Sequence, residues 1–410
     1  MRKTRLAVLF CRLGPYHLAR LRAASGFCDL TAIEYSGKDS IYDWDIINET
    51  EGFKRVTLFE RDDFNRHPRR EFMDVVGRAL HQTKPDVVAI PGWGERCSRA
   101  ALLWCNRNRV PVVVMSDSPQ WLVKRRWWKE LIKRQLLQGV SAGLAAGVSH
   151  REYLAELGLS NERIFLGFDV VDNNHFALEA EKARNNCFEV ARRYALPGHY
   201  FLASSRFVHK KNLDGLLKAY SRFRELVASQ NTTSNGMHSQ LWALVLLGDG
   251  PLREELCRLT SELSLQDSVH MPGFIQYGDL PGYYALAKAF IMPSMSETWG
   301  LTVNEAMACG LPVIVSSRCG CASELVEEGS NGFVFSPYDP EILAQVMLKV
   351  FLLSEERLRQ MGQASSDIIA KWGPIRFALS IQSAADTALR IGPLGGTLTG
   401  RFMLNSLIGL

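Results

Sequence analysis

Short apolar segments alternate with helical stretches along this chain of 410 residues. Residues 6–10 (LAVLF), 86–90 (DVVAI) and 110–115 (VPVVVM) lie in the first half, and residues 244–247 (LVLL) and 289–292 (AFIM) in the second. Strands that are apolar at nearly every position are typical of parallel sheets with helices on both faces. The alternation therefore predicts an α/β fold of doubly wound parallel sheets.

Composition is that of a soluble globular protein in a reducing compartment. Hydrophobic residues make up 47% and charged residues 22%, and the length is sufficient for two domains. The nine cysteines are scattered, and the C-x-C of Cys319 and Cys321 has no second pair at metal-binding spacing. No apolar run reaches the ~18 residues of a membrane span, and residues 6–11 are too short for a signal-peptide core. We therefore expect a cytoplasmic protein with free thiols.

Ligands of doubly wound sheets bind beyond the carboxyl ends of the strands. In the first half, the loop residues expected at that edge include Gly14, His17, Trp93 and Asp117. Gly14 stands alone rather than in a G-x-G-x-x-G pattern, which argues against a nicotinamide-dependent dehydrogenase.

Residues 121–137 (WLVKRRWWKELIKRQLL) form a basic, tryptophan-rich segment with the spacing of an amphipathic helix. Its six cations, which include Lys124, face one acid, Glu130, and the positive excess of the whole chain (+5) lies in residues 1–175. Such a helix suits an anionic membrane surface, which would make the protein peripheral on the inner face of the membrane. The alternative is a helix whose tryptophans pack into the core. Nucleic acid is not expected, because no nucleic-acid-binding fold signature accompanies the segment.

Arg206 and Lys211 follow a predicted strand at residues 200–204 and precede a predicted helix. Arginine, lysine and a helix N-terminus together suit a diphosphate. Lys210 is adjacent to Lys211, and spacing alone chooses between the two.

Glu297 and Glu305 lie in the segment 293–316 (PSMSETWGLTVNEAMACGLPVIVS), where a loop with Thr298 and Gly300 turns into a helix. Carboxylates accept hydrogen bonds, so the pair suits the hydroxyls of a sugar and a ribose.

The segment 293–316 resembles the donor-site motif of the retaining glycosyltransferases of family 4, which have the GT-B fold. Four further elements resemble those of the same family, namely R-x4-K with Ser205 in place of the usual glycine, G-D-G-P at 248–251, G-F at 273–274, and D-x-x-x-F at Asp172 and Phe176. The resemblance implies two Rossmann-like domains facing a cleft. Residues 1–175 would form the acceptor-side domain, 176–373 the nucleotide-sugar domain, 374–390 a helix crossing back to the first domain, and 391–410 a tail without an assigned role.

The resemblance also implies roles for individual residues. Glu297, Arg206 and Lys211 would be catalytic, with the two cations neutralising the leaving diphosphate, Glu297 facing the donor sugar and Glu305 holding the ribose. The other substrate-binding residues would be Gly14, Gly248, Gly250, Gly273, Phe274, Thr298, Trp299, Gly300 and Leu301. No metal or other cofactor is expected.

One departure from the family concerns the acceptor side. Many members carry a histidine there after a middle strand, whereas this chain has none between His81 and His150. The candidates are therefore His17, Asp117 and Trp93, and for His17 and Asp117 a structural role such as a helix cap is an equal alternative.

The family implies transfer of a hexose from a nucleotide-diphosphate sugar (EC 2.4). A glycan or lipid-linked acceptor and a place in polysaccharide or glycolipid assembly are expected. Two alternatives remain, a nucleotide-sugar epimerase with the same fold and a non-catalytic sugar-nucleotide-binding protein.

Overall fold

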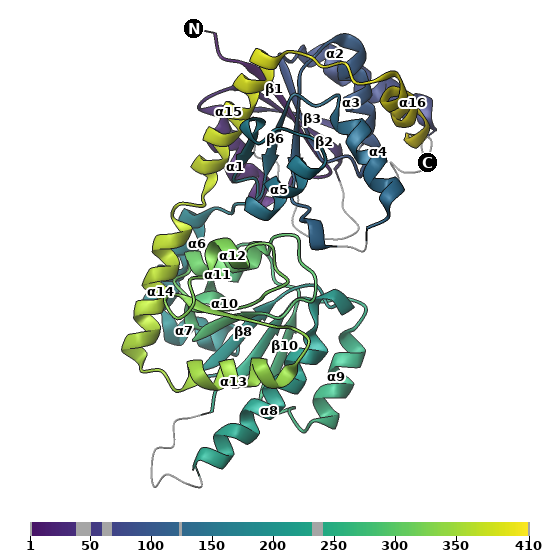
Figure 1. Ribbon diagram of the computed structural model, residues 1–410. Helices are drawn as coiled ribbons and strands as arrows, with labels where there is room; N and C mark the ends of the chain where they lie inside the picture. The colour runs from purple at the N-terminus through teal and green to yellow at the C-terminus, as the bar shows by residue number, and fades with distance from the viewer. Residues whose placement is uncertain (1, 38–50, 60–67, 123–124, 232–240, 409–410) are drawn as a thin grey trace. The chain divides into compact units, whose positions relative to one another are not determined.

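The chain divides into two compact units, each built on one parallel sheet (Figure 1). The computed structural model describes residues 2–37, 51–59, 68–122, 125–231 and 241–408. The N-terminal unit combines Met1–Val171 with Trp372–Leu410, and the C-terminal unit is Asp172–Lys371.

The sheet of the N-terminal unit has the strand order β3-β2-β1-β4-β5-β6-β7, and all its strand pairs are parallel. The strands are β1 (Arg5–Phe10), β2 (Asp29–Ser36), β3 (Lys54–Phe59), β4 (Val87–Pro91), β5 (Val112–Ser116), β6 (Ala142–Ala145) and β7 (Ile164–Leu166). Along β1, Leu6, Val8 and Phe10 pack into one core, and Ala7 and Leu9 into another. Helices thus cover both faces of the sheet, which explains the uninterrupted apolar strands.

The two faces are covered by different helices (Figure 1). On one face lie α1 (Pro15–Ser25) and α15 (Pro374–Ile391). On the other face lie α2 (Arg69–Thr83), α3 (Arg96–Asn108), α4 (Trp127–Leu137) and α5 (Val148–Glu156). Two short 3-10 helices lie in the connections, η2 (Gln120–Leu122) between β5 and α4 and η3 (Asn161–Arg163) between α5 and β7.

Helix α15 belongs to the N-terminal unit although it follows the C-terminal unit in sequence. It packs on α1 and on the sheet, and its small residues Ala378, Ala384 and Ala388 are completely buried in the core that it shares with α1.

Residues 398–407, expected as part of a tail, form the helix α16 (Leu398–Leu407). This helix packs on α3 and α4, where Leu404 and the following Ile408 are buried. The tail is therefore part of the N-terminal unit's second core.

The basic segment 121–137 is not a single helix. Helix α4 begins only at Trp127, and Lys124 lies outside the described residues. The alternative that the tryptophans pack into the core is wrong, because Trp127 is 76% and Trp128 42% exposed. Only Leu136 and Leu137 of this helix are buried.

The C-terminal unit has the strand order β10-β9-β8-β11-β12-β13, again wholly parallel. Its strands are β8 (Tyr200–Ser204), β9 (Ala243–Leu247), β10 (Val269–Gly273), β11 (Ala289–Met292), β12 (Val313–Ser316) and β13 (Gly332–Phe335). Its helices are α6 (Asn173–Asn185), α7 (Cys187–Arg193), η4 (His209–Lys211), α8 (Leu213–Asn231), α9 (Arg253–Glu262), α10 (Leu280–Leu286), α11 (Leu301–Ala308), α12 (Ala322–Leu325), α13 (Pro340–Phe351) and α14 (Glu355–Ile369).

Candidate active site

The strand order of the second sheet reverses at β8, which lies between β9 and β11. In doubly wound sheets the loops on either side of such a reversal diverge and leave space for a ligand beyond the carboxyl ends of the strands. The loop after β8 carries Arg206 and Lys211, and the loop after β11 carries Glu297. The sheet therefore brings together two segments that are about 90 residues apart in sequence.

Lys211 and Glu297 form an ion pair between these two loops. Their side chains are 14% and 12% exposed, so both are largely shielded from solvent but remain accessible. The backbone of Glu297 is held on both sides, since its N–H donates to Arg318 O (3.0 Å) and its carbonyl accepts from Gly320 N (3.2 Å). Lys210 is exposed and its carbonyl accepts from Met295 N. The carboxylate is thus paired with Lys211, the lysine that the spacing selects.

Asn212, which the sequence analysis did not single out, holds three loops together. It has a left-handed backbone (φ 54°) and is buried. Its Nδ2 donates to Pro293 O (3.2 Å) and Pro337 O (3.0 Å). The signal for this role was the position directly after Lys211, because asparagine tolerates the left-handed region better than most residues.

The loop with Arg206 lies tightly against the loop of Gly248 and Gly250. Ser205 N donates to Leu247 O (3.0 Å), and Phe207 N donates to Asp249 O (2.8 Å). A Cβ at Gly248 would lie 1.9 Å from Ser205 O, and one at Gly250 would lie 2.7 Å from Phe207 O. Both glycines are therefore needed for the two loops to approach each other closely. This requirement holds even when no nucleotide is bound.

Gly273 and Phe274 lie at the end of the neighbouring strand β10. Gly273 has a φ of 100°, and its carbonyl accepts from Gly248 N (2.8 Å). Phe274 is 38% exposed and directly follows the residue that accepts from Gly248 N.

Helix α11 begins after Gly300, whose φ is 115°. Just before it, Thr298 lies between Glu297 and the buried Trp299, whose indole Nε1 donates to Asn304 Oδ1 (3.0 Å). The ring of Trp299 is thus fixed in the core. The N–H groups of the first helical residues, beginning at Leu301, form the positive end of the helix dipole beside Glu297. Among the described residues, the buried Thr302 Oγ1 has no hydrogen-bond partner.

Glu305 differs from Glu297 in its environment. It is completely buried within α11, and one carboxylate oxygen accepts from Tyr284 Oη (2.6 Å). The structure therefore places Glu305 in the same element as predicted but behind the surface on which Glu297 lies.

In the N-terminal unit, Gly14 and His17 form the start of α1. Gly14 N donates to His17 Nδ1 (3.0 Å), and Leu13 N donates to the buried Glu34 (3.1 Å). Burial, together with the neighbouring Arg20 guanidinium, lowers the pKa of His17 to about 3. His17 is therefore a neutral cap of the helix, the structural alternative raised above.

Asp117 and Trp93 also lie at the carboxyl edge of this sheet. Asp117 follows β5 and interacts electrostatically with Arg20, whereas Trp93 packs against the core. Arg20, which the sequence analysis did not single out, is buried and donates to Val170 O (2.9 Å) and Asp169 Oδ1 (3.4 Å). It thereby ties α1 to the segment after β7.

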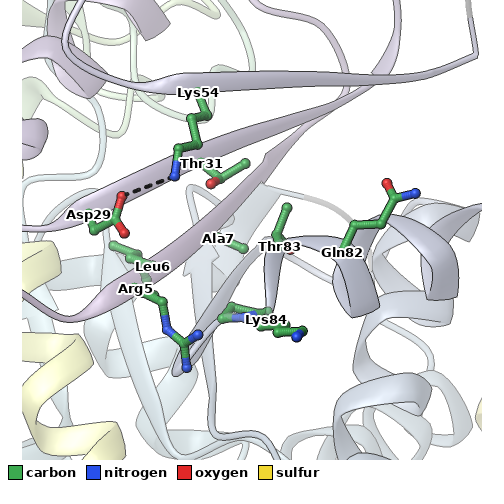
Figure 2. Close-up of a pocket in the computed structure, with 10 residues that line it drawn as sticks. Arg5, Leu6, Ala7, Asp29, Thr31, Lys54, Gln82, Thr83 and Lys84 are labelled. Atoms are coloured by element: carbon green, nitrogen blue, oxygen red, sulfur yellow. Dashed lines mark ion pairs between the residues drawn. The ribbon is translucent and has the colours of Figure 1, made fainter.

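Two cavities lie away from these residues. One of them, of about 240 Å³, lies at the amino ends of β1–β3, and Figure 2 shows Arg5, Lys54 and Lys84 among the residues that line it. Arg5 is paired with Asp86 (2.6 Å) and Lys54 with Asp29 (3.7 Å). A second cavity of about 570 Å³ includes Arg184 and residues preceding β11 and β12. Both are at the amino edges of their sheets, opposite the edge where ligands of this fold class bind.

The described residues contain no group of three or more histidine, cysteine, aspartate or glutamate side chains placed to hold a metal ion. Within the same residues, no helix combines the length and apolar character needed to span a bilayer.

Comparison with known proteins agrees with this arrangement. Residues 195–367 match the family model described as "Glycosyl transferases group 1". Sulfoquinovosyl transferase SQD2 of Arabidopsis thaliana is 35% identical over 132 residues, which are 32% of this chain and 25% of that protein. The GDP-mannose-dependent alpha-(1-6)-phosphatidylinositol monomannoside mannosyltransferase of Mycolicibacterium smegmatis is 30% identical over 203 residues, 47% of this chain and 48% of that protein. This chain thus matches less than half the length of either relative.

Solved structures match over nearly the whole chain. A glycosyltransferase from Rickettsia africae superposes with a TM-score of 0.74 at 13% identity, covering 95% of this chain and 100% of that one. Anabaena HepE in complex with UDP and glucose has a TM-score of 0.69 at 17% identity, covering 92% and 98%. At these identities the likeness is one of fold. The chain therefore has the GT-B fold, and its residues 195–367 match the glycosyl transferases group 1 family.

Proposed function

We propose that this protein is a retaining glycosyltransferase of family 4, which transfers a hexose from a nucleotide-diphosphate sugar to a glycan or lipid-linked acceptor. The observation that carries the proposal is the Lys211–Glu297 pair at the strand-order reversal of the second sheet. The group 1 match over residues 195–367 includes both residues and supports the same assignment. Polysaccharide or glycolipid assembly at the inner face of the membrane is the setting that we propose.

The chemistry is charge neutralisation of a leaving diphosphate. Lys211 and Arg206 would stabilise the negative charge that grows on the diphosphate as the glycosidic bond breaks, together with the N-terminus of α11. Removing one such group typically costs ~3–4 kcal/mol of transition-state stabilisation. Because these groups would stabilise the diphosphate charge, the proposal assigns no role to a metal ion. Glu297 would orient Lys211 and accept hydrogen bonds from donor-sugar hydroxyls.

The proposal also assigns the ribose hydroxyls of the nucleotide to Glu305, and this contact requires a local rearrangement. Because the carboxylate is buried beside Tyr284, ribose hydroxyls reach it only if the residues around it move on nucleotide binding.

A donor screen tests the proposal. Thermal unfolding is measured with uridine, guanosine and adenosine diphosphate sugars for the wild type, Lys211→Ala and the exposed control Lys210→Ala. We expect stabilisation by one nucleotide class, retained in Lys210→Ala and lost in Lys211→Ala. No stabilisation by any donor, or equal stabilisation of Lys211→Ala, would refute the assigned diphosphate site.

Product analysis separates the two alternatives. An epimerase would convert the sugar nucleotide into an isomer without an acceptor, and a non-catalytic binding protein would be stabilised by the donor but leave it intact. Release of nucleoside diphosphate only when an acceptor is supplied supports transfer.

A further inference from the structure

We propose that α4 and α16 form one docking surface for an anionic lipid bilayer, in which apolar side chains of both helices enter the membrane interface. We call this the α4–α16 surface and define it by Trp127, Trp128, Leu131, Leu398 and Phe402. The role of this surface rests on the proposed function, in which the acceptor lies at the membrane. Lipid binding itself requires no sugar donor and can be measured separately.

The two helices are in direct contact. Thr397 Oγ1 donates to Gln135 Oε1 (3.0 Å), and a Cβ at Gly400 would lie 2.8 Å from Gln135 O. Figure 1 shows α16 beside α3 and α4, and the buried Leu404 and Ile408 anchor it there. Glycine at position 400 thus permits the close packing that holds α16 against α4.

Both of the helices that meet at this contact carry exposed apolar side chains. On α4, Trp128 and Leu131 lie seven and four residues before Gln135, which places them on the helix face that contacts α16. On α16, Leu398 directly follows Thr397, and Phe402 lies one turn further on the same face. Leu398 is 80% and Phe402 73% exposed, like Trp127 on α4. Large exposed apolar patches on a protein surface typically mark an interaction site.

The charges around these side chains select the occupant. Glu130, the one acid in the sequences of α4 and α16, is bonded to Arg125 (3.0 Å), Lys133 (2.8 Å) and Tyr153 Oη (2.7 Å). Glu130 therefore holds Arg125 and Lys133 against the protein.

The remaining cations of α4 and its N-terminal flank, Arg126, Lys129 and Arg134, are exposed. Indoles and apolar side chains bordered by free cations fit the headgroup region of an anionic bilayer, where tryptophan occupies the interface and lysine and arginine meet lipid phosphates. If a second copy of this chain bound here instead, the cations of one copy would be buried against the same cations of the other.

Vesicle flotation tests the surface. The vesicles are phosphatidylcholine alone or phosphatidylcholine with about an equal part of phosphatidylglycerol. The full-length proteins are wild type, Trp127→Ser, Phe402→Ser and the control Phe188→Ser. Phe188 is 83% exposed on α7 of the other unit, so it matches Phe402 in exposure but lies outside the surface.

We expect the wild type and Phe188→Ser to float with the anionic vesicles and not with phosphatidylcholine alone. Phe402→Ser and Trp127→Ser should each weaken partitioning by about tenfold, because each removes a large apolar side chain that would enter the membrane interface. Lys129→Gln should weaken it by about fivefold. All these residues are exposed, so the thermal unfolding of the variants should match that of the wild type.

Three results would overturn the inference. The first is a wild type that stays in solution with anionic vesicles, and the second is Phe402→Ser floating like the wild type. The third is a change in the sedimentation coefficient of Phe402→Ser without vesicles, which would make a second copy the occupant. The donor screen on the same variants, carried out in solution, reports separately on the proposed transferase.

Discussion

Lys211 and Glu297 are paired across the loops after β8 and β11, so the cation proposed for the diphosphate is held in place by the carboxylate proposed for the sugar. This pair pre-orients Lys211 before any donor binds, since a lysine side chain would otherwise lose considerable rotamer entropy on ordering. In the proposed function, the diphosphate of a bound donor would have to share or replace the carboxylate as the partner of the ammonium group.

Lys211→Ala should lower kcat/KM for transfer by about 10²–10³-fold, because the developing charge on the leaving group loses a direct stabiliser. Lys210→Ala removes the same charge from an exposed position one residue away and should change kcat/KM by less than about threefold. Steady-state kinetics with the donor found in the screen provides the measurement. Equal losses in the two variants would mean that the loop needs only net positive charge.

Gly248→Ala should destabilise the C-terminal unit by at least about 2 kcal/mol, because the new Cβ would meet Ser205 O at a backbone of φ 121°. Gly278→Ala is the matched control, since a Cβ there has nothing within 4 Å. Chemical denaturation of both variants measures the difference. If Gly248→Ala unfolds like Gly278→Ala, the close approach of the two loops does not require the glycine.

Tyr284→Phe should cost ~1–3 kcal/mol of unfolding free energy, because the completely buried Glu305 loses the hydroxyl that donates to its carboxylate. Tyr338→Phe removes a hydroxyl from a side chain that is 63% exposed and should be nearly neutral. Urea titrations of the two variants compare them. A neutral Tyr284→Phe would show that Glu305 has no need of this donor.

Protonation of His17 should destabilise the N-terminal unit in acid. Its folded-state pKa of about 3 lies below the ~6.5 of an unfolded histidine, so the unfolded state binds the proton more strongly. The contribution is complete above about pH 6.5 and is lost as the pH falls towards 3, with a limiting slope of ~1.4 kcal/mol per pH unit.

His17→Gln keeps a side-chain acceptor for Gly14 N–H without a titrating group. The wild type should therefore lose stability relative to His17→Gln between pH 6.5 and 4, as measured by urea denaturation. Parallel pH profiles for the two proteins would contradict a neutral, partly buried His17.

The parallel strands were predictable because burial on both faces leaves a local mark. Residues 200–204, 244–247 and 289–292 are apolar at almost every position, and they form β8, β9 and β11. The cationic loop before α8 and the turn into α11 were also predictable, since each follows such a strand directly. Spacing alone chose Lys211 over Lys210 as the lysine for a diphosphate, and the ion pair of Lys211 with Glu297 became visible only in the structure.

The segment 121–137 and the tail were less predictable. The amphipathic spacing of Trp127 and Trp128 is the same whether the indoles face a core or solvent, and it cannot tell the two apart. The ten residues of α16 mix apolar and polar side chains and follow a segment with Gly392, Gly395 and Gly396, so nothing local marked them as the partner of α4. Their position follows from Leu404 and Ile408 fitting the second core of the N-terminal unit.

By itself, the sequence determined the α/β architecture and the residue types of the proposed diphosphate site, because strand burial and loop chemistry are encoded within a few neighbouring residues. Only the tertiary structure decided that Glu297 reaches Lys211 while Glu305 lies buried beside Tyr284, and that the C-terminal helix extends the exposed surface of α4. These outcomes depend on contacts between segments tens to hundreds of residues apart, and exposure is a property of what packs against a residue rather than of the residue itself.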